Sequence, residues 1–279
     1  MNSRKKEKKA VITVTFILIL LSISCLFPFY WMVRSSFLSN LEIYSFPPVM
    51  FPKVLRFENY PKALTTFPFH LYLLNTLKIV IPNLIGTLLT STMAAYSLAR
   101  LRFPGRDLIF TLVVVSMLVP LTVTIIPVFL GWTALGLSQG FIPLIVPAFL
   151  GGGGFNIFLI RQFLLTIPRD IDEAAYIDGA GHVRILFQVL LPLITPVLIA
   201  VFLFTFILHW NDVLGPVVYI SRNSNNTISQ ALANFRAGFG TDYKSIMAVS
   251  TLSVTPAVVL FLIGQKYFIS GIVMTGIKG

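Results

Sequence analysis

Residues 108–160 read LIFTLVVVSMLVPLTVTIIPVFLGWTALGLSQGFIPLIVPAFLGGGGFNIFLI, without a single charged side chain. A helix of about 20 apolar residues crosses the hydrocarbon core of a bilayer, so this stretch is long enough for two spans. We expect these spans near Leu108 to Leu130 and Ile142 to Ile160, with the turn in Gly131 to Gly140. The run Gly151 to Gly154 favours close helix packing or a local break inside the second of them over a contact with substrate.

The composition of the whole chain agrees with a lipid environment. Of its 279 residues, 56% are hydrophobic and 11% are charged, and the mean hydropathy is +0.86. A soluble domain carries about a quarter charged residues. The net charge of +11 could suggest nucleic acid in a soluble protein, but basic residues collect on the cytoplasmic loops of membrane proteins. We therefore expect lipid contact and no nucleic-acid partner.

Four further charge-free runs complete the set of predicted spans. They are residues 10–32, residues 79–98, the segment between Arg184 and Asp212, and the segment between Lys244 and Lys266. The chain is thus predicted to be an all-α membrane protein with six transmembrane helices. We divide it into residues 1–70, which hold the N-terminal tail, first span and outer loop, and residues 71–279, which form the core transmembrane domain.

The distribution of Lys and Arg predicts the orientation. The N-terminal tail and the short loops after the second and fourth spans carry many of the basic residues, whereas the other side holds fewer of them on longer loops. Short basic loops face the cytoplasm. Both termini are therefore predicted to be cytoplasmic.

The sequence lacks common motifs for nucleotide binding, metal binding and nucleophilic catalysis. The sequence has no G-x-x-x-x-G-K-[ST] phosphate loop, no H-E-x-x-H pair and no G-x-S-x-G elbow, and its three histidines are widely separated. Ion-coupled carriers place ionisable groups inside the membrane, but Lys78, Asp212 and Lys266 fall near the ends of spans. We predict no catalytic residue, no metal site and no bound cofactor, and a transport function that is powered by another subunit.

The loop at residues 161–188 holds the most informative segment, IPRDIDEAAYIDGA at residues 167–180. Pro168 suits the first position of a helix, and the acidic residues that follow suit its positive N-terminal end. Gly179 predicts the end of the helix, because glycine adopts left-handed backbone angles without steric cost. We therefore predict that this segment forms a short, partly acidic helix that enters a groove on a partner protein.

This segment resembles the signature of binding-protein-dependent permeases of ATP-binding-cassette (ABC) importers. The matching residues are Glu173-Ala174-Ala175, Gly179, Val189, Leu191 and Pro192, with Val189 in place of the usual Ile. Other segments resemble the carbohydrate-uptake branch of this family, and specifically its maltose-type second permease. They are Asn75-Thr76-Leu77, AAYSLAR at residues 94–100, FPGR at residues 103–106, Trp210-Asn211-Asp212 and GIKG at residues 276–279.

The resemblance implies a type I importer permease in the bacterial cytoplasmic membrane. Its partners would be a homologous permease in a heterodimer, two ATPase subunits that bind ATP and Mg, and an extracytoplasmic solute-binding protein. A coupling helix would dock in the ATPase through Glu173, Ala174, Ala175, Asp178 and Gly179. The cargo implied is a sugar or oligosaccharide, moved by alternating access; an amino acid, peptide or other polar solute is the alternative.

Candidate groups along the substrate pathway are polar or aromatic residues within the spans. Sugars need hydrogen-bonding side chains and aromatic faces, and buried charges would have to be paired. These criteria select Asn83, Asn156, Trp210 and Asn211, although Trp210 could equally be an interfacial anchor. Two rival interpretations remain. An intramembrane enzyme would need polar catalytic groups within the spans, of which the chain offers few, and an ATP-independent channel or carrier would require no coupling helix.

Overall fold

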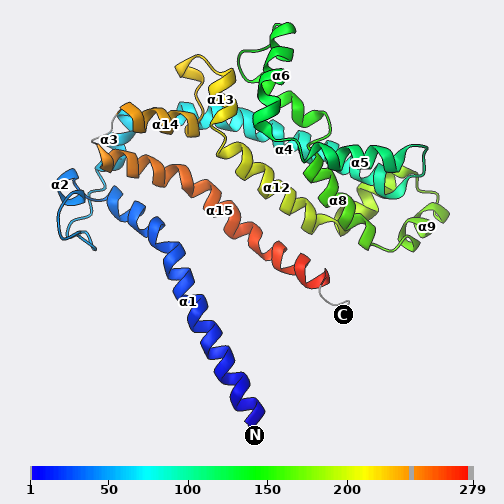
Figure 1. The fold of residues 1–279 in the computed structure, drawn as a ribbon, viewed down its shortest axis with the longest axis horizontal. Coiled ribbons are helices and arrows are strands. Elements are labelled where there is room, and N and C mark those ends of the chain that lie inside the picture. Colours follow the sequence, from blue (N-terminus) through cyan, green and yellow to red (C-terminus); the bar gives the residue numbers. More distant parts are fainter. Residues whose placement is uncertain (1, 239–241, 276–279) are drawn as a thin grey trace. The chain divides into compact units, whose positions relative to one another are not determined.

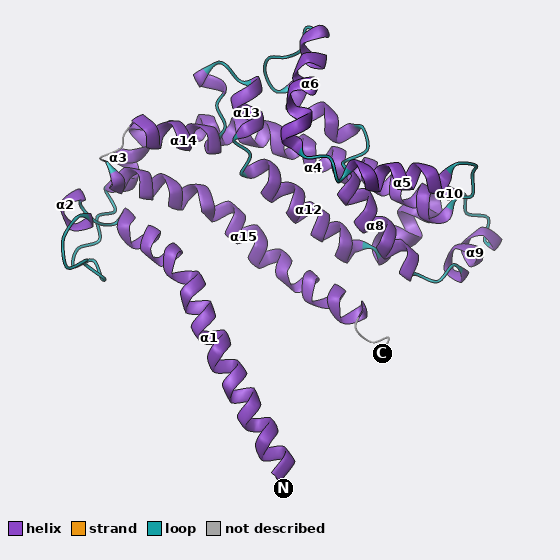
Figure 2. Ribbon diagram, viewed as in Figure 1, coloured by secondary structure: helices purple, strands orange, loops and turns teal. Residues whose placement is uncertain are grey.

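The computed structural model describes residues 2–238 and 242–275 (Figure 1). Within these residues every regular element is a helix, which confirms the predicted all-α class (Figure 2). The chain divides into two compact units. The first contains Met1–Phe69 and Leu232–Thr255, and the second contains His70–Ala231 and Pro256–Gly279.

The first unit is built on α1 (Asn2–Ser36), α2 (Asn40–Ile43) and α3 (Asn59–Thr66). Ser39 begins α2 with a capping box, in which the Ser39 hydroxyl and the Glu42 carboxylate each bond the other's main chain. The buried Asn59 amide donates to the carbonyls of Ser36 and Leu38 at 2.8 and 2.9 Å. Asn59 therefore satisfies the carbonyls at and just after the end of α1.

Among the residues that the structure describes, four helical stretches are long and apolar enough to cross a membrane, and two bent pairs of helices bring the number to six if each pair is one span. The four are Lys8–Ser36, Phe69–Arg100, Ile142–Thr166 and Tyr243–Gln265; the bent pairs are Arg106–Ser116 with Leu121–Ala134 and His182–Leu193 with Thr195–Trp210. This arrangement agrees with the six spans that the sequence predicts.

The third predicted span is not a straight helix. α5 (Arg106–Ser116) and α6 (Leu121–Ala134) meet at 104°, and Pro120 caps the start of α6. Proline offers no main-chain N–H and disfavours a helical conformation of the residue before it. The bend between these helices therefore lies at Pro120.

The second unit is organised around α4 (Phe69–Arg100), α8 (Gly154–Thr166) and α12 (Thr195–Trp210). The π-helical turn η2 (Ile185–Leu190) connects α10 (His182–Arg184) to α11 (Leu191–Leu193). Their apolar side chains form one core, which includes Ala95, Leu98, Ile160, Leu164, Ile185, Leu190 and Val201. The loop with α9 (Asp170–Ile177) leaves this core between α8 and α10.

The span at residues 142–166 is broken in its middle. α7 (Ile142–Ile145) and η1 (Val146–Phe149) precede three consecutive glycines with positive φ, and α8 begins at Gly154. A Cβ on Gly152 would lie 2.7 Å from the Thr87 carbonyl oxygen of α4. Both predictions for the glycine run, a break and close helix packing, are confirmed.

Short helices follow α12. They are α13 (Leu214–Tyr219), η3 (Asn223–Asn225) and α14 (Ile228–Gly238), and α15 (Tyr243–Thr275) is the last helix. Asn75 near the start of α4 donates to the carbonyls of Ser224 and Asn226, at 2.8 and 3.2 Å. The Asn75 amide therefore holds the loop between α13 and α14 against α4.

Candidate functional site: the loop helix and its base

The short helix α9 forms where the sequence predicts it, with a slightly later start. It begins at Asp170, two residues after Pro168, and the N–H groups of Asp172 and Glu173 donate to the Arg169 carbonyl. Three acidic residues occupy its first turn. This placement suits the helix dipole, because negative charge is favoured near the exposed N–H groups of a helix N-terminus.

Gly179 ends α9 in the predicted left-handed conformation, with φ of +79°. The Gly179 N–H donates to the Tyr176 carbonyl at 3.0 Å, and the Ala180 N–H donates to the Ala175 carbonyl at 2.9 Å. This pair of bonds is the Schellman motif, which satisfies the last carbonyls of a helix and turns the chain away from its axis. Gly179 thereby sets the direction in which residue 180 enters the core.

The outer face of α9 is available to a partner. Glu173, Ala174 and Asp178 are exposed, whereas Ala175 is half-buried and packs against the core of the second unit. Ile177 is 87% exposed, and the sequence analysis did not select it. An isoleucine held in water next to two carboxylates is a signal for a docking surface, because its burial by a partner would be favourable.

The inner face of α9 carries a buried ion pair with the end of α4. The Arg100 Nε lies 2.9 Å from the Asp172 Oδ2, and the two side chains are only 5% and 10% exposed. The Arg100 Nη2 also donates to the Ile167 carbonyl at 3.0 Å. Burial raises the pKa of the Asp172 carboxyl, while the Arg100 charge acts in the opposite direction.

Two more arginines bind the last turn of α4 from the other side. The Arg161 Nε donates to the Leu98 carbonyl at 3.2 Å, and the Arg169 Nη2 donates to the Ala99 carbonyl at 3.3 Å. The carbonyls at a helix C-terminus lack partners within the helix and carry partial negative charge. Arginines from α8 and from the start of α9 therefore cap α4 and hold it to the loop.

A histidine provides a further connection. The hydroxyl groups of Tyr96 in α4 and Tyr176 in α9 both lie within hydrogen-bonding distance of the His182 Nδ1, and the Tyr96 distance is 3.2 Å. His182 begins α10 directly after the loop. The helix α9 is thus connected to α4 at its first turn through Asp172 and at its last turn through Tyr176.

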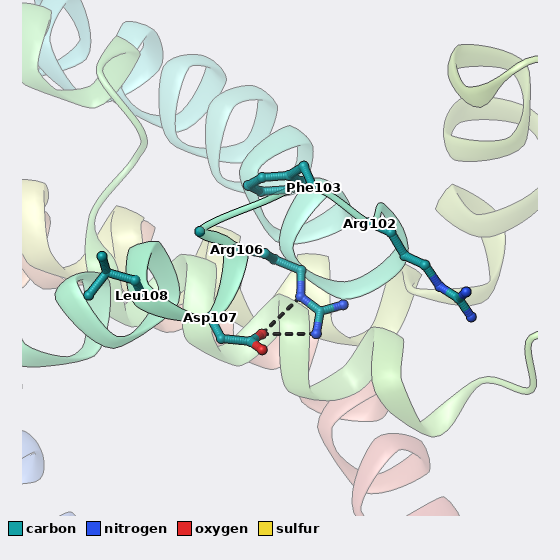
Figure 3. A pocket seen from close by; sticks show the side chains of 6 residues that line it. Arg102, Phe103, Arg106, Asp107 and Leu108 are labelled. Atoms are coloured by element: carbon teal, nitrogen blue, oxygen red, sulfur yellow. Dashed lines mark hydrogen bonds and ion pairs between the residues drawn. The ribbon is translucent and has the colours of Figure 1, made fainter.

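The cavity next to this region lies in the loop between α4 and α5. It has a volume of about 360 Å³ and is lined by Arg102, Phe103 and residues 105–108. Figure 3 shows that Arg106 points to Asp107, with two nitrogen–oxygen distances of 2.9 Å, while Arg102 points away from this pair. The Arg106 charge is therefore already compensated within the cavity.

Each of the four candidate pathway residues makes contacts within its own part of the helical core. The Asn83 amide donates to the Ile79 and Leu144 carbonyls, the Asn156 amide to the Gly152 carbonyl and the Asn211 amide to the Ile207 carbonyl. Trp210 is buried and stacks on Phe206. These contacts give each residue a structural role, and their place along a substrate pathway stays a prediction.

In the described residues, the arrangement of up to six apolar spans, with a short exposed acidic helix between the fourth and the fifth, defines a helical membrane protein. The chain belongs to the family of binding-protein-dependent transport system inner membrane components, whose model matches residues 86–273. This membership confirms the resemblance carried by the Glu173-Ala174-Ala175 motif. It also confirms the interpretation as a transport subunit rather than an enzyme.

Individual relatives cover nearly the whole chain. The diacetylchitobiose uptake system permease protein NgcG of Streptomyces coelicolor is 34% identical over 252 residues, which are 90% of this chain and 83% of the relative. The arabinooligosaccharides transport system permease protein AraQ of Bacillus subtilis is 30% identical over 276 residues, 96% of each chain. The sequence relationship therefore extends beyond the motif to both units.

A solved structure has the same fold. In the crystal structure of a bacterial ABC transporter involved in the import of the acidic polysaccharide alginate, one chain matches with a TM-score of 0.80 and 24% identity. The match covers 94% of this chain and 98% of that chain. It confirms the predicted importer permease fold.

Proposed function

We propose that this chain is the transmembrane permease subunit of an ABC importer that translocates a sugar or oligosaccharide by alternating access. The observation that carries the proposal is α9, a short helix with an exposed acidic and apolar outer face, on the fold of a transport-system membrane component. ATP and Mg would bind to separate ATPase subunits, and α9 would transmit the closure of those subunits to the spans.

The residues of α9 have separate roles in this proposal. Glu173 and Asp178 offer carboxylates to basic groups of an ATPase groove, the exposed Ala174 permits close approach of that groove, and the half-buried Ala175 permits close approach of α9 to its own core. Gly179 sets the angle between the docked helix and the helix that follows. Removing one member of a charge pair at a partly buried interface costs about 2–5 kcal/mol, so these contacts can decide docking.

The remaining partners follow from the same proposal. A homologous permease would complete a heterodimer, and an extracytoplasmic binding protein would deliver the substrate. Many apolar side chains of α5 and α6 are exposed in the isolated chain, among them Leu112, Val123 and Ile126. Exposed apolar surface of this kind is covered by lipid or by a second subunit.

A saccharide cargo is supported by the names of the two relatives, which take up diacetylchitobiose and arabinooligosaccharides. Asn83, Asn156, Trp210 and Asn211 remain the candidate pathway residues. An amino acid, peptide or other polar solute is the second candidate cargo. Uptake by a strain that lacks this chain distinguishes them: loss of saccharide uptake is expected, and loss of only amino-acid or peptide uptake would contradict the saccharide assignment.

Both termini are proposed to be cytoplasmic, in a bacterial cytoplasmic membrane. Cys25 is the one cysteine of the sequence, so Cys25→Ser provides a cysteine-free background. In intact cells, a membrane-impermeant thiol reagent should label Ser224→Cys and leave Arg184→Cys unlabelled. The opposite pattern would reverse the orientation.

The docking role of α9 is tested by co-purification with the candidate ATPase subunit. Glu173→Lys is expected to abolish co-purification, because it places a positive charge where the groove is predicted to be basic. Glu58→Lys is the matched control, since it reverses an exposed carboxylate in the first unit. Retained co-purification and uptake in Glu173→Lys would contradict the coupling assignment.

A further inference from the structure

The last turn of α4 and the segment from Ile167 to Asp172 contact each other in both directions. Arg100 of α4 reaches the Ile167 carbonyl and the Asp172 carboxylate, at 3.0 and 2.9 Å. Arg169 reaches back to the Ala99 carbonyl at 3.3 Å. The base of α9 is therefore attached to α4 by charged groups and not only through the chain.

Burying the Arg100 and Asp172 charges is energetically unfavourable. Removing a guanidinium and a carboxylate from water costs several kcal/mol per ion, and apolar residues of similar size often stabilise such a site equally well. Among the described residues, neither the Asp172 Oδ1 nor the Arg100 Nε has a hydrogen-bond partner, so the two side chains are held by charge at this contact. The pair is thus a poor device for stability, and a directional role explains its presence better.

The geometry of Arg100 suits a directional role. Its Nη2 donates a hydrogen bond to the Ile167 carbonyl, and its Nε lies at ion-pair distance from the Asp172 carboxylate without a hydrogen bond, so one planar group contacts two points of the loop. Lysine has a single ammonium on a flexible stem and does not offer this fork. The orientation of α9 about the end of α4 is consequently restricted.

We infer that Arg100 and Asp172 are positioning residues for energy coupling, which transmit the displacement of α9 to α4. This inference rests on the proposed function, in which an ATPase subunit moves α9. When the ATPase subunit displaces α9, Asp172 moves with it. Separating Asp172 from Arg100 would leave two buried charges unpaired, so α4 is expected to follow the displacement.

Movement of α4 has consequences within the membrane, because α4 holds the broken span. Asn83 donates to the Leu144 carbonyl at 2.9 Å, and Thr90 donates to the Ala148 carbonyl at 3.0 Å. Gly152 packs against the main chain of Thr87. The carbonyls left free by the break are therefore bound to α4, and α7 and η1 are expected to move with it.

The competing route runs through the chain itself. Ala180 and Ile185 lie in the core after the loop, so α9 could transmit its movement to η2 and α12 alone. In that case the ion pair would contribute to stability at most. The two routes differ in what happens when the pair is replaced by apolar residues.

The experiment uses the complete transporter in proteoliposomes and the double variant Arg100→Met with Asp172→Leu. Apolar replacement of both partners leaves no unpaired buried charge, so thermal stability and co-purification of the ATPase subunit are expected to be retained. The number of substrate molecules transported per ATP hydrolysed is expected to fall by about tenfold, within the usual range of coupling between sites.

The matched control is Arg106→Met with Asp107→Leu. This pair also has a nitrogen–oxygen distance of 2.9 Å, but Asp107 is largely exposed, and among the described residues the pair forms no hydrogen bond or ion pair with α9. Transport per ATP is expected to be unchanged in the control. A similar loss in both double variants would overturn the inference.

A normal transport-to-ATP ratio in Arg100→Met with Asp172→Leu would also overturn it. If this double variant does not assemble, Asp172→Asn is used, since it removes the charge at nearly constant shape; normal coupling in Asp172→Asn would overturn the inference in the same way. Failure of the proposed function is distinguishable, because the ATPase subunit would then not co-purify even with the unaltered chain.

Discussion

Gly179→Ala tests how the end of α9 determines coupling. Gly179 has φ of +79°, and a Cβ built on it meets no atom within 4 Å. The substitution therefore adds no steric overlap in this chain, and its effect comes from the backbone conformation alone. The sequence analysis expected the left-handed conformation; the open space around the Cβ is known only from the structure.

The magnitude follows from the left-handed strain. An L-residue with a Cβ costs roughly 1–2 kcal/mol in this conformation, whereas asparagine adopts it more readily. A free-energy difference of that size corresponds to about a 5- to 30-fold change in an equilibrium. The balance between the capped loop, with its bonds from Gly179 and Ala180, and an uncapped loop should shift by this factor.

Gly181→Ala is the matched control. Gly181 has φ of −78°, and a Cβ there also meets no atom within 4 Å. Both variants reduce the conformational freedom of the unfolded chain by a similar amount, so their difference isolates the left-handed strain. The order of increasing damage should be Gly181→Ala, Gly179→Asn and Gly179→Ala.

The assay is binding-protein-stimulated ATP hydrolysis and substrate uptake by the reconstituted transporter. Gly179→Ala should lower uptake relative to Gly181→Ala, by at most the factor of about 5 to 30 that the strain allows. Equal uptake in the two alanine variants would show that the Schellman turn does not set the orientation of α9, and the reasoning would then fail.

Two further predictions concern the broken span and use thermal melting of the purified protein. Gly152→Ala combines a positive φ with a Cβ 2.7 Å from the Thr87 carbonyl oxygen, and should destabilise the protein by about 2–6 kcal/mol. Gly151→Ala is the control: the nearest atom to its Cβ is 3.9 Å away, so it should destabilise the protein by only about 1–3 kcal/mol. A larger loss of stability in Gly151→Ala than in Gly152→Ala would contradict the importance of close packing at Gly152. Asn83→Leu removes the donor to the Leu144 carbonyl and should cost about 1–3 kcal/mol; an unchanged melting temperature would show that another group satisfies that carbonyl.

The sequence alone does not show which prolines bend a transmembrane helix. Pro28, Pro82 and Pro256 lie inside continuous helices, whereas Pro120 coincides with the 104° bend between α5 and α6. Each proline removes one main-chain donor, but neighbouring helices can accommodate the carbonyl that is left free. Which proline bends a span therefore depends on packing that sequence analysis does not reveal.

The sequence by itself determined the all-α class, the approximate positions of the spans and the existence of α9 with its end at Gly179. These features depend on local properties: apolar length, the absence of charge, acidic residues at a helix start and glycine at a helix end. Only the tertiary structure decided that Arg100 pairs with Asp172 and that Asn83 binds a carbonyl of the broken span. Both contacts join residues far apart in the chain, and their geometry exists only after α4, α7 and α9 have packed together.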